Sequence, residues 1–212
     1  MKITLFLALV LLFVALSTKP LLGTKYTLPN RAIRDTSGKN VISGAQYYIV
    51  PGSPVVGGVG LARRGKEHCP LDVVVVVNGN RGLPVVFTPV NTIKSVIRAD
   101  TDLNINFYTE TSCPESNVWK LGDFNSTTGQ WCVTTGGYLG DPWNYDNIYN
   151  WFKIHTYEDK EDVYALSYCP SVCNKKGCEH ECSSIGIYED HYGKRLGLND
   201  FRYPVRFQRA AA

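Results

Sequence analysis

Cysteines are the residues of this 212-residue chain whose types and spacing most directly suggest chemistry. Four of the seven form the pattern Cys169-x3-Cys173-x4-Cys178-x3-Cys182. In an antiparallel hairpin the two outer cysteines lie opposite each other, the two inner ones likewise, and all four share one face. This register predicts nested disulfides 169–182 and 173–178. A zinc cluster that includes His180 is the alternative, because the same spacing tolerates tetrahedral ligands.

The N-terminal segment favours disulfides over zinc. A basic residue precedes the apolar run Ile3–Leu16 and a stretch of small residues, which is typical of a secretory signal peptide. We expect residues 1–23 to be this signal peptide, with cleavage after Ser17 or Gly23. The rest, residues 24–212, is predicted to be one soluble domain that is secreted to the extracellular space or routed to a vacuole. Disulfides persist in such an oxidising compartment.

The other three cysteines extend this framework. Cys69 and Cys113 would form the third bridge, which is worth about 4 kcal/mol in the entropic model of a loop of this size. Cys132 then lies outside every pair. It is either a buried thiol or an exposed thiol that forms a disulfide dimer between two chains.

Motifs for catalysis or cofactor binding are incomplete. Gly60–Lys66 imitates a phosphate-binding loop without its Ser or Thr, and Asp100–Asn104 begins like a calcium loop without its Gly and Glu. The four histidines have no Ser or Cys partner in a recognisable nucleophile motif. We therefore predict no enzyme, no metal and no cofactor. A formal net charge of +3 without a basic block argues against a nucleic-acid or anionic-membrane partner.

The cysteines and the other candidate residues must be positioned by strands, because helical periodicity is nearly absent from the sequence. Short runs rich in β-branched and aromatic residues predict strands at 47–50, 73–77, 85–87, 103–108, 130–134, 151–156, 163–168, 185–188 and 204–208. The pattern is typical of an all-β sandwich or barrel. The five valines at 73–77 are expected to cross the core.

Three hairpin-like units, each with an Asp before a Gly, suggest a threefold repeat: Ile33–Ile49, Val118–Val133 and Ile185–Leu198.

The first of these units resembles the opening signature of the soybean trypsin inhibitor (Kunitz) family of plant proteins. It reads Ile33-Arg-Asp35-Thr-Ser-Gly38-Lys-Asn-Val41, followed by Tyr47-Tyr-Ile49. Further segments match the family in order, especially its miraculin-like branch: Cys69–Leu71, Asp102–Phe107, Trp119–Leu121, Thr128–Trp131, Trp151–Ile154, Tyr168–Cys173 and Ile185–Tyr188. The resemblance implies a β-trefoil, which is a six-stranded barrel capped by three hairpins, with bridges Cys69–Cys113, Cys169–Cys182 and Cys173–Cys178.

In inhibitory members of this family, an exposed loop between the fourth and fifth strands docks into serine proteases. The matching stretch here is residues 88–95. The resemblance therefore implies a reactive loop that contains Pro89, Val90, Asn91, Thr92, Ile93 and Lys94. A loop that the scaffold holds in an extended, substrate-like form loses little entropy on docking. The fixed φ of Pro89 suits such a loop.

The residue that sets specificity has two candidates by this resemblance. Counting from Pro89 places Asn91 in the primary pocket of the enzyme, whereas Lys94 would suit the buried carboxylate of trypsin. Strong inhibitors brace the loop with an Asn from the first hairpin, and the matching position here is Ser43, whose reach is shorter. These departures argue against potent trypsin inhibition, so the expected partner is a serine protease that is either subtilisin-like, with a wider pocket, or trypsin-like.

The leading interpretation is a secreted serine protease inhibitor that acts in plant defence. The alternative is a miraculin-like trefoil without inhibitory activity, which binds a carbohydrate or a protein receptor. Residues 136–151 interleave aromatic side chains with Asp and Asn, so they are either a sugar-stacking patch or a loop with Trp151 in the core. Asn125-Ser-Thr127 is a sequon that predicts N-glycosylation in a secreted chain.

Overall fold

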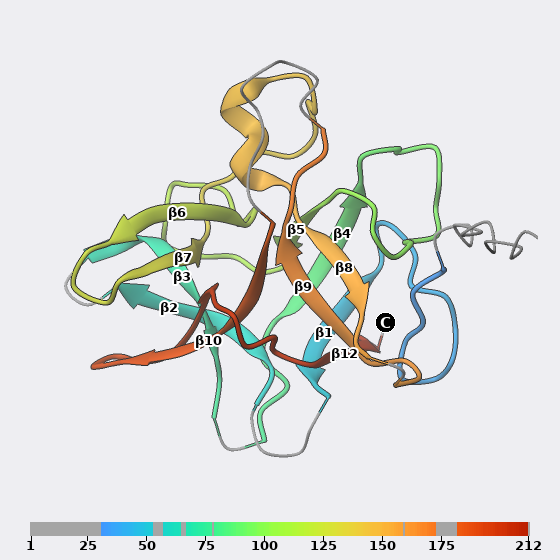
Figure 1. The fold of residues 1–212 in the computed structure, drawn as a ribbon, viewed down its shortest axis with the longest axis horizontal. Coiled ribbons are helices and arrows are strands. Elements are labelled where there is room, and N and C mark those ends of the chain that lie inside the picture. Colours follow the sequence, from blue (N-terminus) through green and yellow to red (C-terminus); the bar gives the residue numbers. More distant parts are fainter. Residues whose placement is uncertain are drawn as a thin grey trace, which may run out of the picture.

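The computed structural model describes residues 31–52, 57–64, 67–77, 79–158, 160–172 and 182–211. This part of the chain folds into twelve strands and one 3-10 helix (Figure 1). The elements are β1 (Gln46–Pro51), β2 (Val59–Arg64), β3 (Glu67–Val75), β4 (Pro84–Pro89), β5 (Leu103–Phe107), β6 (Lys120–Asn125), β7 (Gln130–Thr134), η1 (Tyr145–Asn150), β8 (Lys153–Thr156), β9 (Tyr164–Tyr168), β10 (Ser183–Asp190), β11 (Gly193–Leu198) and β12 (Val205–Arg209).

Six of the strands close into a barrel. Strand β1 pairs with β12 on one side and with β4 on the other, and β4 pairs in turn with β5. A bridge between Leu103 and Phe152 joins β5 to the start of β8. Strand β8 pairs with β9, and β9 pairs with β12, which completes the circuit. Closure leaves the barrel without an exposed edge, so its backbone groups are satisfied internally.

Three hairpins cap this barrel: β2–β3, β6–β7 and β10–β11. Their inner strands meet around a threefold axis, because β3, β7 and β11 each pair with the other two. Each third of the chain thus supplies two barrel strands that flank one hairpin. The predicted β-trefoil is confirmed. The first repeat differs from the prediction, since its cap is β2–β3, whereas Ile33–Ile49 leads into barrel strand β1.

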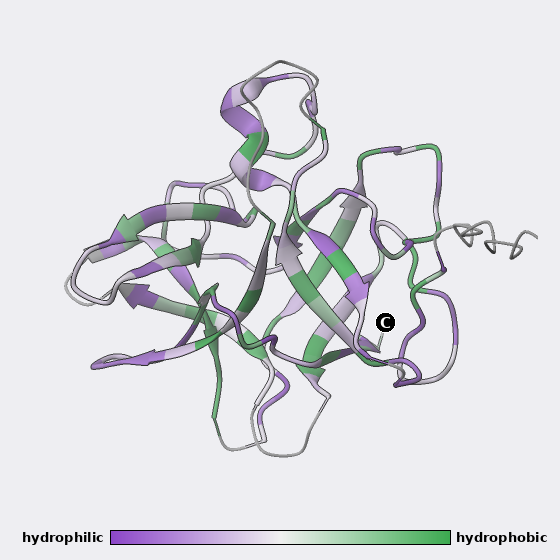
Figure 2. Cartoon of the chain, in the orientation of Figure 1, coloured by the Kyte–Doolittle hydropathy of each residue, from purple (hydrophilic) through white to green (hydrophobic). Residues whose placement is uncertain are grey.

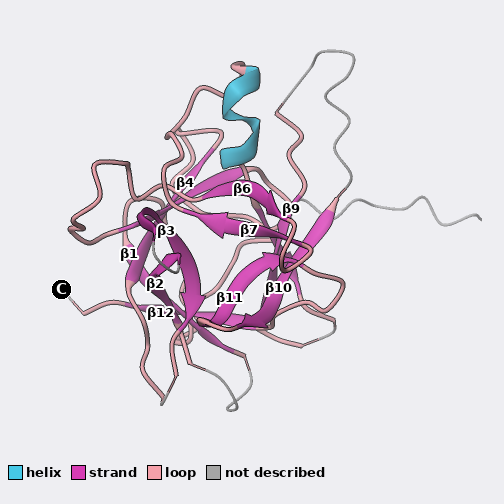
Figure 3. Cartoon of the chain, turned by 90° about the vertical axis from the view of Figure 1, so that its left-hand side faces the viewer, coloured by secondary structure: helices cyan, strands magenta, loops and turns pink. Residues whose placement is uncertain are grey.

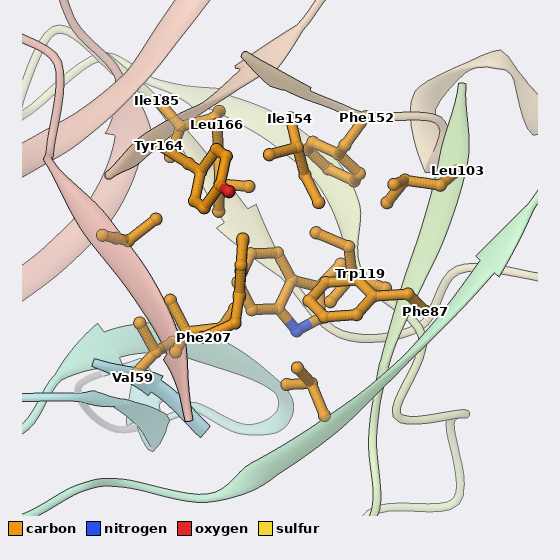
Figure 4. Close-up of a cluster of buried hydrophobic side chains, with 14 of the residues drawn as sticks. Val59, Phe87, Leu103, Trp119, Phe152, Ile154, Tyr164, Leu166, Ile185 and Phe207 are labelled. Carbon is orange, nitrogen blue, oxygen red and sulfur yellow. The ribbon is translucent and has the colours of Figure 1, made fainter. Parts of the chain in front are cut away.

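Aromatic side chains fill the centre of the barrel (Figure 4). Phe87 from β4 and Phe207 from β12 meet edge to face, with ring centroids 5.2 Å apart. Trp119 is fully buried and contacts the rings of Phe107 and Phe152, at centroid distances of 5.5 and 6.1 Å. Such pairs contribute about 0.5–1.5 kcal/mol each beyond simple burial. Apolar and polar residues alternate along β5 and β12 (Figure 2), whereas every residue of β9 is buried.

The valine run does not cross the core as predicted. Strand β3 ends at Val75, with Val73 and Val75 buried and Val77 exposed. The alternation arises because β3 belongs to a cap hairpin and presents only one face to the core.

A buried ion pair ties two of the caps together. Arg195 of β11 is 2% exposed, and its Nη1 donates to Asp72 Oδ2 of β3 at 2.5 Å. Its Nε donates to Asp190 Oδ2 at 2.9 Å. Removal of Arg195 would take a cationic partner from both carboxylates at once, so this contact helps to fix how the two caps pack.

Two of the three predicted disulfides lie in the described part of the chain. Cys69 and Cys113 are bridged with their Cα atoms 5.6 Å apart, and Cys169 is bridged to Cys182. Tyr168 pairs with Ser183, which is the register deduced from the cysteine spacing. The second bridge uses two thiols that the zinc alternative would need. The predicted bridge 173–178, His180 and the predicted signal peptide lie outside the described residues.

The seventh cysteine, Cys132 on β7, is buried at 1% exposure. Its Sγ lies 2.9 Å from the hydroxyl oxygen of Tyr188 on β10. Burial, and then the contact with Cys132, raise the pKa of the Tyr188 hydroxyl far above its usual value. This environment favours the buried-thiol alternative over an exposed thiol that pairs between chains.

Helix η1 stands outside the strands, at the top of Figure 3. The side chain of Asn144 caps it by accepting a hydrogen bond from the amide of Asp146. Among the described residues, no helix combines the length and the apolar character needed to cross a membrane. Trp151, directly after the helix, is buried in the core as predicted.

Candidate functional site

The connection between β4 and β5 projects from the barrel, at the upper right of Figure 1. Pro89 is buried at the end of β4, and residues 90–95 are all exposed. Exposed segments on a rigid sheet are common binding sites. The stretch predicted as the reactive loop is therefore accessible, and its base is part of the barrel.

Residues 91–94 at the tip of this loop form a tight turn. The amide of Lys94 donates to the carbonyl oxygen of Asn91 at 3.1 Å, and the amide of Ile93 donates to Asn91 Oδ1 at 3.2 Å. Asn side chains commonly stabilise turns in this way. The tip therefore differs from the extended form expected from the sequence, because one asparagine satisfies two amides locally. Ile93 stands at the apex with 93% of its surface exposed.

Both limbs of the loop are fixed just below the turn. On the outgoing limb, the amide of Val90 donates to the carbonyl oxygen of Asp102 at 2.9 Å. On the return limb, the amide of Ser43 donates to the carbonyl oxygen of Ser95 at 2.6 Å. The Ser43 hydroxyl donates to the carbonyl oxygen of Phe87 at 3.1 Å. Ser43 therefore supports the base of the loop rather than its tip.

A hollow lies between the two limbs, beneath the turn. It is lined by the loop from Pro89 to Val96, except Thr92, and by Arg98 and Thr101. In the described part of the chain, the hydrogen bonds of residues 91–94 stay within the turn. The turn is thus anchored at its two ends, and among the described residues no hydrogen bond reaches it from the hollow.

The first hairpin holds the return limb. Ile97 is bonded to both of its sides, since it accepts from the amide of Ile33 and donates to the carbonyl oxygen of Val41. Asp35 is 1% exposed and sets the hairpin turn, because its Oδ1 accepts from the Ser37 amide at 2.8 Å, the Ser37 hydroxyl at 2.6 Å and the Lys39 amide at 3.0 Å. Burial alone would raise the pKa of Asp35, but these hydrogen bonds lower it below its usual value.

A chain of three side chains anchors the connection between β4 and β5 beyond the loop, near its entry into β5. Asp100 Oδ1 lies 2.5 Å from His155 Nδ1, and His155 Nε2 lies 2.5 Å from the hydroxyl oxygen of Ser167. The order is that of a hydrolase triad. However, Ser167 is buried on β9, between partners on β8 and β10, so a substrate has no access to it. The arrangement anchors this connection instead of performing catalysis.

A second carboxylate reinforces this anchor. Asp102 is buried, and its two oxygens accept from the amide and the hydroxyl of Ser171 at 3.0 and 2.5 Å. Sequence reasoning missed both anchors, because Asp100, His155 and Ser167 share no motif. The pairing of β8 with β9 was the signal that could have placed His155 beside Ser167.

The remaining predicted sites lie away from the loop. Asn125 begins the turn between β6 and β7, where its Oδ1 accepts from the amides of Thr127 and Thr128. Its glycosylation stays a prediction. Tyr138, Trp143 and Tyr145 are exposed before and within η1.

The fold is a disulfide-bonded β-trefoil that presents an exposed, anchored loop, and protease inhibitors have the same architecture. A Kunitz-type cysteine protease inhibitor from potato has a TM-score of 0.76 and 31% identity, covering 87% of this chain and 100% of that one. The Kunitz legume family model, described as trypsin and protease inhibitor, matches residues 33–209. The chain therefore belongs to the plant Kunitz family of inhibitors and is not an enzyme.

Two relatives illustrate the range of this family. Miraculin from Synsepalum dulcificum is 36% identical, over 92% of this chain and 90% of that protein. Kunitz trypsin inhibitor 5 from Arabidopsis thaliana is 33% identical, over 84% of this chain and 85% of that protein. The similarity thus spans nearly the whole described trefoil, including the loop.

Proposed function

We propose that this chain inhibits a serine endopeptidase by placing the loop of residues 88–95 in the active site of the enzyme. The observation that carries the proposal is the exposed turn at 91–94, whose limbs are fixed by the Val90–Asp102 and Ser43–Ser95 hydrogen bonds. A loop that is already ordered loses less conformational entropy on docking, so more of its contact energy becomes affinity.

The same anchors explain how an inhibitor differs from a substrate. Cleavage within the turn would leave both new chain ends tied to the barrel, through Val90 on one side and Ser95 on the other. The amine that leaves would stay beside the acyl-enzyme at a high effective concentration. The peptide bond would therefore re-form faster than water could release the enzyme.

The setting that we propose is secretion and defence. The N-terminal pattern of residues 1–23 and the two disulfides both suit an oxidising, extracellular compartment. The target is a serine endopeptidase of the trypsin-like or subtilisin-like kind. Because the potato relative is named as a cysteine protease inhibitor, papain belongs in the test as a second enzyme class.

The test is a titration of the purified mature protein against trypsin, chymotrypsin, elastase, subtilisin and papain. We expect one-to-one inhibition of at least one serine enzyme and a complex that survives gel filtration. A variant with residues 91–94 replaced by Gly-Ser-Gly-Gly is the matched control, with its fold checked by circular dichroism. The proposal fails if none of the four serine enzymes is inhibited at micromolar protein.

A second candidate function rests on a different surface. Trp143 is 73% exposed, and Tyr138, Tyr145 and Tyr149 are exposed in the same segment, where polar side chains separate them. Exposed aromatic rings with neighbouring amides and carboxylates suit the stacking of sugar rings. Miraculin is also among the relatives. A glycan screen tests this function, with Trp143→Ala against Phe201→Ala, another exposed aromatic residue, as control.

A further inference from the structure

We infer that Ile93 is the residue that enters the primary pocket of the target enzyme, and that this pocket is apolar and uncharged. The inference rests on the proposed function and names the specificity residue of that loop. It replaces both candidates that the sequence offered, Asn91 and Lys94.

The exposure of its side chain favours Ile93 as the residue that enters the pocket. Ile93 is 93% exposed, more than any other large apolar side chain in the described part of the chain. It stands at the apex of the turn, so it is the first side chain that a concave surface would meet. Val90, on the outgoing limb, adds a second exposed apolar group. Apolar anchors that fill a pocket carry much of the energy of tight interfaces.

Asn91 is already engaged in hydrogen bonds within the turn. Its carbonyl oxygen accepts from the amide of Lys94, and its Oδ1 accepts from the amide of Ile93. To enter a pocket, the Asn91 side chain would have to break the turn that it forms. Attack at the carbonyl carbon of Asn91 would also disrupt the hydrogen bond to Lys94. Asn91 is therefore a positioning residue.

The two peptide bonds that flank Lys94, Ile93–Lys94 and Lys94–Ser95, differ in how close they lie to the braced base of the loop. The carbonyl oxygen of Ser95 is bonded to the amide of Ser43, so the chain just after Lys94 belongs to the braced base. Within the described residues, the carbonyl oxygens of Ile93 and Lys94 both accept no hydrogen bond, but that of Ile93 lies one residue farther from the braced base and is the more open to an oxyanion hole. The Ile93–Lys94 bond is thus the one that the turn presents.

The covalent step follows from this geometry. The enzyme's serine oxygen attacks the carbonyl carbon of Ile93, the bond to the Lys94 nitrogen breaks, and the departing proton of the serine goes to that nitrogen. The new amine of Lys94 remains beside the carbonyl oxygen of Asn91, and the amide of Ile93, whose acyl group is now esterified to the enzyme's serine, remains beside Asn91 Oδ1. One residue holds both sides of the broken bond, so the reverse reaction is favoured.

The chemistry of the side chain then selects the enzyme. A branched hydrocarbon cannot pair with the carboxylate at the base of the trypsin pocket, and its entry would leave that charge desolvated. An elastase-like or subtilisin-like pocket contains no charge, so the entry of Ile93 carries no such desolvation cost there. We therefore expect apolar-specific enzymes to be the targets.

The deciding experiment compares inhibition constants for elastase, subtilisin and trypsin. Ile93→Asp should weaken inhibition of the apolar-specific enzyme about 100-fold, and Ile93→Lys should shift preference toward trypsin by a similar factor. Lys94→Ala tests the rival specificity residue and should weaken inhibition far less than Ile93→Asp, whereas His191→Ala, at an exposed position outside the loop, is the matched control and should leave the constants unchanged. If instead Lys94→Ala abolishes inhibition and the Ile93 variants do not, the inference is overturned while the proposed function stands.

A direct readout locates the bond that is attacked. The protein is incubated with a catalytic amount of the enzyme that it inhibits best, and the new N-terminus is sequenced. A chain that begins at Lys94 supports the inference, whereas one that begins at Thr92 or Ser95 overturns it. If no enzyme is inhibited by the unmodified protein or by Ile93→Lys, the proposed function fails and takes the inference with it.

Discussion

The backbone amide of Ser43 donates to the carbonyl oxygen of Ser95, and the two atoms are 2.6 Å apart. The hydroxyl of Ser43 is bonded at the same time to the carbonyl oxygen of Phe87, at the end of the outgoing limb. A single residue of the first hairpin therefore joins the two limbs of the loop. Ser43 itself does not line the hollow beneath the turn, whereas its partner Ser95 does.

Ser43→Asn is expected to tighten inhibition about tenfold. The longer amide carries two donors and an acceptor, so it can reach the hollow and support the turn from below. The measurement is the inhibition constant together with the rate of loop cleavage. Ser43→Ala is the control, because it removes only the bond to Phe87 and should cost about 1 kcal/mol of unfolding free energy. If Ser43→Asn changes neither the inhibition constant nor the rate of loop cleavage, the longer side chain does not reach across the hollow to the turn, and the prediction is wrong.

His155→Ala is expected to loosen the connection between β4 and β5 near its entry into β5. The change removes the contacts to Asp100 and Ser167 and leaves a buried hydroxyl without its partner, at a cost of about 1–3 kcal/mol. Urea unfolding measures this loss, and amide exchange at residues 100–102 should speed up. His191→Ala, which changes an exposed histidine on another hairpin, should leave both unchanged. Equal effects of the two substitutions would contradict the anchoring role.

Asp35→Asn is expected to lower stability at neutral pH and to matter little in acid. The folded state holds the pKa of Asp35 below its ordinary value of 3.8, so its charged form stabilises the fold above that pH. This contribution is lost as the pH falls through the folded pKa. We expect a difference of about 1–3 kcal/mol at pH 7 that shrinks below about pH 4.

The measurement is urea unfolding of both proteins at a series of pH values. Asp123→Asn, on an exposed position of β6, is the matched control and should show no such trend. A stability difference for Asp35→Asn that stays constant down to pH 2 would refute the role of the charged carboxylate.

The thiol of Cys132 should resist reagents until the protein unfolds. The residue is buried, and Tyr188 covers its sulfur. We expect no reaction with Ellman's reagent in the native protein and one thiol per chain in denaturant, if the predicted bridge 173–178 is also formed. Rapid reaction of the native protein, or a dimer that reducing agent dissolves, would contradict the buried environment.

The sequence predicted the parts of the structure that depend on local rules. The Asp35 turn and the register of Cys169 with Cys182 follow from neighbouring residues and strand parity, and both were found. Three strands were missed: β2, β6 and β11. Each contains a glycine where a side chain would collide, as at Gly197, whose Cβ would lie 2.6 Å from the carbonyl oxygen of Trp131. Glycine is required there for close approach, but it weakens the strand pattern.

The loop likewise could be predicted only as far as local rules apply. Its location between β4 and β5 could be inferred, whereas the shape of its tip depends on where the side chain of Asn91 bonds. In the Asp100–His155–Ser167 chain, the contact of Asp100 with His155 joins side chains 55 residues apart in the sequence. Pairing of β8 with β9 could have placed His155 beside Ser167, but the contact with Asp100 is set by the closed barrel and leaves no mark in the spacing of the residues.

The closure of the barrel by β1 and β12 has a consequence for biosynthesis. Strand β1, which follows the supporting hairpin, pairs with the last strand of the described chain, and Arg209 donates to the Tyr47 hydroxyl across 162 residues. The amide of Thr36 in that hairpin also bonds to the carbonyl oxygen of Phe207. Contacts so distant in sequence form late. Before β12 is synthesised, a nascent chain lacks the contacts that hold the first hairpin and, through it, the loop. We therefore expect the chain to bind an enzyme only after β12 has been translated.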